Sequence, residues 1–163
     1  MYNLSLEVIN KTTPYKVKYD QGEYVFETET GSIYNISFDE DLQIAGNITY
    51  QFCIRRHIIR DKSFDSRVQQ TIIAIILEFF KQDENILLYT CDNSDNREAA
   101  RSRLFLRWFN EVNTMSGFVL KSANTVVEGQ GFYFAIIIPR NHPSLEAICS
   151  EFDEVAAHLT SNK

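Results

Sequence analysis

Five basic residues surround the junction between an apolar strand pattern and an apolar helix pattern. They are Arg55, Arg56, Arg60, Lys62 and Arg67. Guanidinium groups stay charged and bind phosphate or carboxylate oxygens through paired hydrogen bonds, and a helix N-terminus adds a positive partial charge. The segment therefore predicts a site for a small anionic ligand or an acidic protein surface. The alternative is structural: strand alternation divides the basic residues between two sheet faces, where they pair with Asp61 and Asp65.

A second candidate site follows the apolar strand pattern ILLYTC. It consists of Asp92, Asp95, Arg97 and Arg101. The carboxyl ends of strands in open α/β sheets commonly bind ligands. Two aspartates can act as a base, but this loop supplies too few oxygen or imidazole ligands for a metal ion, so we expect no metal. Capping of the next helix by Ser94 or Asp95, with an ion pair from Asp to Arg101, explains the same residues without a ligand.

Other catalytic patterns are missing from the sequence. The three histidines show no HxxxH spacing, and no GxSxG motif accompanies them. Cys53, Cys91 and Cys149 lack CxxC spacing and lie in apolar patterns, so we expect reduced core thiols. Trp108 lies among arginines at helical spacing, which favours a helix with a buried face over an RNA-stacking platform.

Composition favours one domain over residues 1–163, with 44% hydrophobic and 13% aromatic residues to form its core. The formal charge of −6 opposes binding of nucleic acid, which requires a basic surface. The N-terminus lacks the pattern of a signal peptide, and no apolar run is long enough to span a bilayer. We therefore expect a cytoplasmic protein that does not enter the membrane.

Hydrophobic periodicity predicts the order of the elements. A meander over residues 15–38 is followed by a loop over 39–47, a long strand from 48, a buried helix over 66–82 and a strand over 86–91. An amphipathic helix over 96–112, two strands at 118–122 and 132–138, and a helix from Pro143 complete the chain. In the long strand, Ile48 shares a face with Phe52. In the helix over 66–82, Leu77 belongs to the predicted apolar stripe. The last helix also has an apolar stripe: Leu145, Ile148, Phe152, Val155, Ala156 and Leu159.

This order predicts an α+β fold, with a mixed, mostly antiparallel sheet of about six or seven strands and helices on both faces. It resembles the plan of the GCN5-related N-acetyltransferase family. The likeness covers roughly residues 24–138. It is carried by the strand before Asn93 or Asn96, which would open the second helix, and by Gly117 and Phe118, which follow that helix. The chain also resembles small uncharacterised bacterial domain families.

The acetyltransferase resemblance implies acetyl-coenzyme A as cofactor, held by a glycine-rich turn after the long strand. Here that turn, RRHIIRDKSFDSR, contains no glycine, so side chains obstruct the approach of a pyrophosphate to the backbone. We therefore predict a noncatalytic binding or interaction domain without a cofactor. The alternative is an acyl-coenzyme A dependent N-acyltransferase in which Arg60 and Arg67 contact phosphate and Asp92 or His57 is the base. An antitoxin-like protein that neutralises a partner is a third class compatible with the acidic charge.

Overall fold

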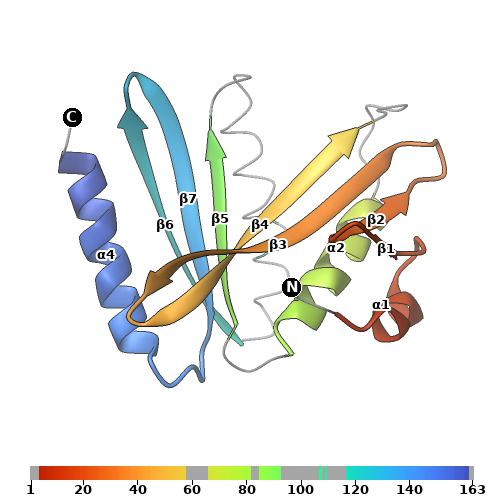
Figure 1. Ribbon diagram of the computed structural model, residues 1–163, viewed down its shortest axis with the longest axis horizontal. Coiled ribbons are helices and arrows are strands. Elements are labelled where there is room, and N and C mark those ends of the chain that lie inside the picture. The colour runs from red at the N-terminus through yellow and green to blue at the C-terminus, as the bar shows by residue number, and fades with distance from the viewer. Residues whose placement is uncertain are drawn as a thin grey trace. The chain divides into compact units, whose positions relative to one another are not determined.

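The computed structural model describes residues 4–57, 66–81, 85–92, 107, 109 and 117–161 (Figure 1). Its elements in chain order are α1 (Leu6–Thr12), β1 (Lys18–Asp20), β2 (Glu23–Glu27), β3 (Ile33–Ile44), β4 (Asn47–His57), α2 (Ser66–Phe79), β5 (Ile86–Asp92), β6 (Phe118–Val127), β7 (Gln130–Pro139) and α4 (Leu145–Ser161).

The strands form one seven-stranded sheet in the order β1-β2-β3-β4-β5-β7-β6. The pairs β1–β2, β2–β3, β5–β7 and β6–β7 are antiparallel, whereas β4 and β5 are parallel. A parallel pair needs a crossover connection, and α2 lies in the connection from β4 to β5. The predicted α+β class with a mixed, mostly antiparallel sheet is therefore confirmed.

Three of the connections between neighbouring strands are turns of two residues. They are Gln21-Gly22, Ala45-Gly46 and Glu128-Gly129, and all six residues have positive φ. This is the requirement of a type I′ turn, whose twist matches that of the flanking strands. The predicted loop over 39–47 is wrong, because β3 continues to Ile44 and turns only at Ala45-Gly46. Hairpin pairing overrides the weak strand propensity of the acidic residues from Asp39 to Asp41.

The chain divides into two compact units, each made from two separate segments. The first consists of residues 1–39 and 52–82. Its buried side chains include Phe26, Phe38 and Phe52 from the strands and Ile75 and Phe79 from α2. The rings of Phe38 and Phe79 stack with centroids 4.5 Å apart. Helix α1, which the sequence analysis did not predict, contacts α2.

The second unit consists of residues 40–51 and 83–163. Its core is a cluster of buried apolar residues from four elements, β3, β5, β7 and α4: Ile44, Ile86, Phe134, Ile136, Ile138, Ile148 and Phe152. Helix α4 has two further polar contacts in this unit. The Glu151 carboxylate accepts a hydrogen bond from the Ala45 N–H, and Asp153 pairs with Lys121 of β6 at 2.6 Å. Helix α4 therefore has a polar contact with the β3–β4 hairpin and another with β6.

Most of the predicted core positions are buried, and three are wrong. Val155 of α4 and Leu77 of α2 are 40% and 39% exposed, because an apolar residue is covered only where a neighbouring element packs against it. Ile48 of β4 is exposed while Thr49 is fully buried, yet Phe52 is buried further along the strand. The buried positions therefore change phase between Thr49 and Phe52, where the chain passes from one compact unit to the other.

Candidate functional site

Arg55 and Arg56 lie near the end of β4, where strand alternation directs their side chains to opposite faces. Arg55 forms an ion pair with Glu23 of β2, and its side chain is 63% exposed. The hydrogen bond to Glu23, followed by the negative charge of that residue, raises the pKa of Arg55 above its usual range. The guanidinium is therefore positioned by a carboxylate on the neighbouring strand.

Arg56 belongs to a different contact, at one end of a stack of aromatic rings. Tyr34 of β3 stacks on Phe26 of β2 at 5.2 Å, and Phe26 stacks on Tyr15 at 5.9 Å, with the planes within 12° of parallel in both pairs. The Arg56 guanidinium lies over the Tyr34 ring at 5.5 Å, and the Arg67 guanidinium lies over the Tyr15 ring at 5.1 Å. We call the three rings the ring stack. It has an arginine at each end.

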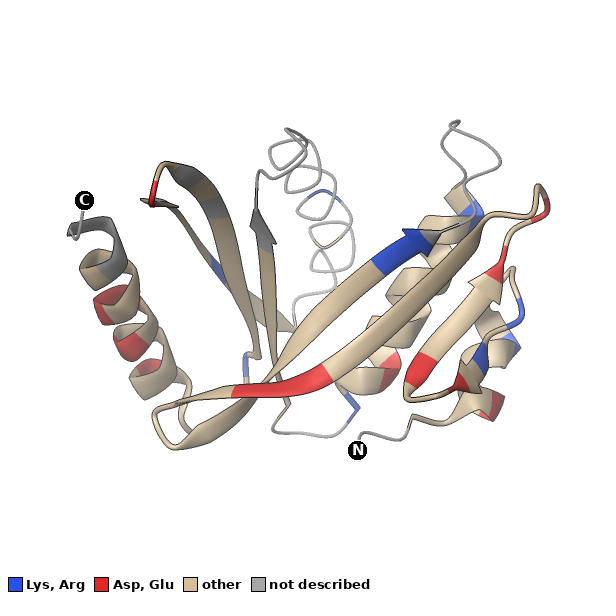
Figure 2. Cartoon of the chain, turned by 45° about the horizontal axis from the view of Figure 1, so that its top comes forward, with Lys and Arg blue, Asp and Glu red and all other residues tan. Residues whose placement is uncertain are grey.

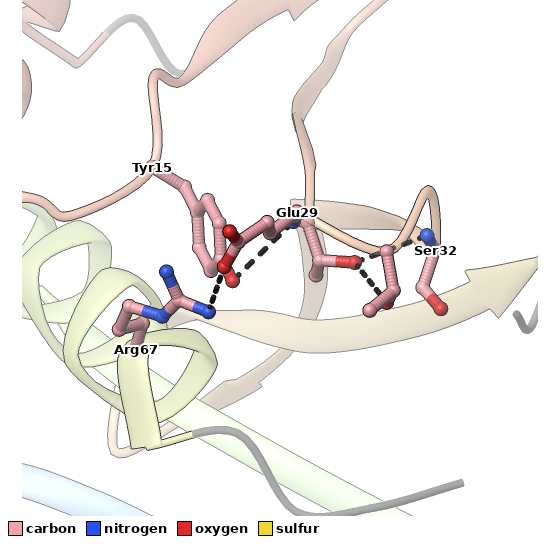
Figure 3. A network of polar contacts seen from close by, with 6 residues as sticks. Tyr15, Glu29, Ser32 and Arg67 are labelled. Carbon is pink, nitrogen blue, oxygen red and sulfur yellow. Dashed lines mark hydrogen bonds and ion pairs between the residues drawn. The ribbon is translucent and has the colours of Figure 1, made fainter. Parts of the chain in front are cut away.

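Arg67, in the first turn of α2, is held by a carboxylate as well as a ring (Figure 3). Its guanidinium is 2.8 Å from the Glu29 carboxylate, and the Glu29 N–H donates to the Tyr15 hydroxyl at 3.4 Å. The connection that carries Glu29 is itself fixed, since the Ser32 N–H donates to the Thr28 hydroxyl at 3.0 Å. The local fold thus orients Arg67 through contacts with two segments near the start of the chain.

The structure separates the basic residues that the sequence groups together. Arg56 and Arg67 lie at opposite ends of the ring stack, and Arg55 is on the other face of β4, so these three do not converge on one small anion. The predicted division between two faces is consistent with the placement of Arg55 and Arg56, but the observed partners are Glu23 and Glu29. Arg60 and Lys62, like Asp61 and Asp65, lie outside the described residues.

Charge is unevenly distributed over the described elements. Figure 2 shows basic residues at the end of β4 and the start of α2, and acidic residues along the middle of β3 and on α4. Stacking occupies the flat face of a guanidinium, whereas its N–H groups point outward in the plane of the group. An oxyanion can therefore approach Arg67 along its edge while Tyr15 supports its face.

The second predicted site can be placed only in part. Asp92 is the last residue of β5, in the middle of the sheet. The described residues do not include the side chain of Asp92. They also exclude Asp95, Arg97 and Arg101. Nearby, the Gln51 side-chain amide donates to the Thr90 hydroxyl at 3.1 Å. Over the described part of the chain, no three of His, Cys, Asp and Glu come close enough to hold a metal ion.

The arginines can be found from the sequence, but the rings that position them cannot. Period-two aromatic residues in 24–28 and 34–38 indicated a shared face on each strand, yet the register between strands depends on the turns. Pairing of Phe26 with Tyr34 creates the centre of the ring stack. The predicted strand pattern begins at Tyr15, but β1 begins only at Lys18. Alternation within one segment gives no information on a contact with Arg67.

A comparison with protein-family models gives one match for the chain. Residues 64–154 match a model described as "Family of unknown function (DUF6169)". The chain belongs to this family. The DUF6169 match includes α2, β5, β6, β7 and most of α4. Arg67 therefore lies within the family segment, whereas Arg55 and Arg56 precede it.

Two other comparisons give no relative for this DUF6169 member. No curated protein and no solved structure matches the chain. The match to a family of unknown function agrees with the expected resemblance to small uncharacterised domain families, and nothing in these comparisons supports the resemblance to acetyltransferases. Among the described helices, none is long and apolar enough to cross a membrane.

Proposed function

We propose that this DUF6169 protein is a noncatalytic binding module that recognises an anionic group through Arg67. The observation that supports the proposal is the placement of Arg67 at the start of α2, over the Tyr15 ring and beside Glu29. Its side chain is 45% exposed, so part of it is accessible from solvent. A ligand oxyanion of phosphate or carboxylate type would replace the Glu29 carboxylate on Arg67.

The geometry supports exchange of the Glu29 carboxylate for an oxyanion of the ligand. Glu29 is 72% exposed and follows the end of β2, so its side chain can swing into solvent while the Tyr15 contact keeps Arg67 in place. A guanidinium already ordered by the fold loses less conformational entropy on binding. The N-terminus of α2 adds a favourable partial charge at the same position. Arg60 and Lys62, in the connection before α2, are further candidates for contact with the ligand.

Calorimetric titration with inorganic phosphate and with coenzyme A tests this proposal. Arg67→Gln should weaken binding by tenfold or more, because a charge-assisted pair is worth roughly 1.5–3 kcal/mol. Arg140→Gln makes the same change of charge at an exposed residue of the second unit and should leave binding unchanged. Glu29→Gln should strengthen binding, because it removes the competing carboxylate. Equal affinity in the native chain and both Arg67 and Glu29 variants would exclude this site.

The same titration separates the binding module from the acyltransferase alternative. Acetyl-coenzyme A shares its phosphates with coenzyme A and adds only the acyl thioester. Comparable binding of both compounds supports recognition of an anion alone. Markedly tighter binding of acetyl-coenzyme A, together with its turnover on an amine acceptor, would favour the transferase.

A cytoplasmic location belongs to the same proposal. Cys53 and Cys149 are free thiols, each half-buried in a different unit of the chain. Free thiols persist in reducing compartments, where disulfide formation is disfavoured. Fractionation of cells that express the native chain would test this location, and recovery in a secreted fraction would contradict it.

A further inference from the structure

The two strands at the edges of the sheet differ in how they are protected from pairing with another strand. At one edge, β1 has only three residues, of which Lys18 and Asp20 are charged. Short length and charge are devices that prevent unwanted pairing at a sheet edge. At the other edge, β6 has ten residues, without proline or glycine. Only Lys121 is charged, and its charge is paired with Asp153 of α4.

The register of the β6–β7 hairpin shows which backbone groups of β6 point away from β7. Val127 and Gln130 flank a two-residue turn, so they form a hydrogen-bonded pair. Pairs alternate along an antiparallel ladder, so the even-numbered residues from Phe118 to Val126 direct their N–H and C=O groups to the outer edge. Among the described residues, β6 has no second strand neighbour.

We infer that this edge binds a second copy of the chain, with the two β6 strands antiparallel around a two-fold axis at Ser122. This register uses every outward backbone group from Phe118 to Val126. It places Ser122 opposite its own copy and Leu120 opposite Asn124. The two sheets would then form one continuous sheet, with both copies of α4 on the same face. The inference is independent of the proposed anion site, which lies in the other unit.

Side chains favour a second copy as the occupant of the edge. Val126 is 45% exposed, so a large part of its apolar surface is in contact with solvent in the single chain. In the inferred register it lies opposite Phe118 of the second copy, a β-branched and aromatic pair of the kind that stabilises sheets. Lys121 lies opposite Ala123, so no like charges face each other across the strands. Although each chain has a formal charge of −6, no two like-charged residues of the β6 strands face each other in this register.

Cysteine cross-linking of the full chain tests the register. Opposite residues of a hydrogen-bonded antiparallel pair have Cα atoms about 5.5 Å apart, within the range of a disulfide. Ser122→Cys should give a covalent dimer under mild oxidation. Asn124→Cys is the matched control: it is equally placed on the outer edge, but faces Leu120 and should not cross-link to itself. Cross-linking of both variants at the same rate would overturn the register.

Mass measurement by light scattering tests the association itself. We expect twice the chain mass of 18.9 kDa at high protein concentration. Val126→Lys should shift the protein to the monomer, because it places a charge against Phe118 of the second copy. Val155→Lys makes the same change at an exposed valine of α4 and should leave the dimer intact. A monomeric mass for the native chain at every concentration would overturn the inference and leave the edge to a strand from another protein.

Discussion

Arg67 and Tyr15 form a contact whose energy can be separated from that of the neighbouring ion pair. The guanidinium lies 5.1 Å from the Tyr15 ring centre and 2.8 Å from the Glu29 carboxylate. A double-mutant cycle with Arg67→Ala and Tyr15→Leu, made in chains that all carry Glu29→Gln to remove the ion pair, should give a coupling of about 0.5–1 kcal/mol, the range for a cation over a ring near the surface. The measurement is the free energy of unfolding in urea for the four chains. A coupling of zero would mean that the ring does not position the arginine.

Cys53 makes stability depend on pH in the alkaline range. Burial, followed by the negative charge of Asp39, raises its pKa above the ordinary value of 9.0. Well below pH 9.0 the Cys53 thiol is protonated in both the folded and the unfolded chain, and its contribution to the free energy of unfolding is fully present. As pH rises above 9.0, the unfolded thiol loses its proton before the folded thiol does, so the free energy of unfolding falls.

Replacement of Cys53 by alanine should remove this contribution. Unfolding in urea between pH 8 and 10 compares the native chain with Cys53→Ala, and we expect a smaller loss of stability with pH in the variant. The other thiols remain in both chains and cancel in the comparison. Identical slopes would show that the folded environment does not hold the Cys53 thiol neutral.

Among the elements, the hairpins depend on residues with positive φ, and Gln21-Gly22 allows the clearest test. Gln21 has φ of 48° and Gly22 has φ of 84°, and a Cβ added at Gly22 would meet no atom within 4 Å. Gly22→Ala should therefore cost about 1–2 kcal/mol through backbone conformation alone. Gln21→Asn should stabilise the chain by a few tenths of a kcal/mol or more, because asparagine tolerates this conformation. Thermal unfolding of both variants measures these opposite shifts.

The sequence predicts those elements whose signal is local, and its errors arise where distant segments decide the structure. The apolar run from Ile86 is a buried strand as predicted. A continuous apolar run is buried wherever it lies between two other strands, and β5 lies between β4 and β7. The sequence does not predict the β3–β4 hairpin, because the acidic residues at 39–41 have a low strand propensity and the strand is stabilised by pairing with its neighbour. Ala45-Gly46 is nevertheless a recognisable turn signal. At the candidate site, the arginines could be found from their charge. The separation of Arg56 from Arg67 by the ring stack depends on strand register and on the contact of Tyr15 with Arg67, and alternation within one segment predicts neither.

At the scale of the whole molecule, the segment that defines the family does not coincide with either compact unit. Residues 64–154 contain α2 without the strands that cover it, and β5 without β4. The missing part includes Ile44 of the second core, the Ala45 N–H that binds Glu151, and the residues of β4 that pair with β5. It also includes Phe38, which stacks on Phe79. Both cores would be incomplete in this segment.

We therefore predict that residues 64–154 do not fold alone, whereas the full chain unfolds cooperatively. Removal of the earlier strands exposes the apolar faces of α2 and β5 and leaves backbone groups of β5 unpaired, and both effects oppose folding. Circular dichroism and amide dispersion in two-dimensional NMR spectra of the segment and the full chain provide the comparison. A dispersed spectrum and a cooperative transition for residues 64–154 would instead show that the family segment carries a complete core, and that the first 63 residues are an addition to it.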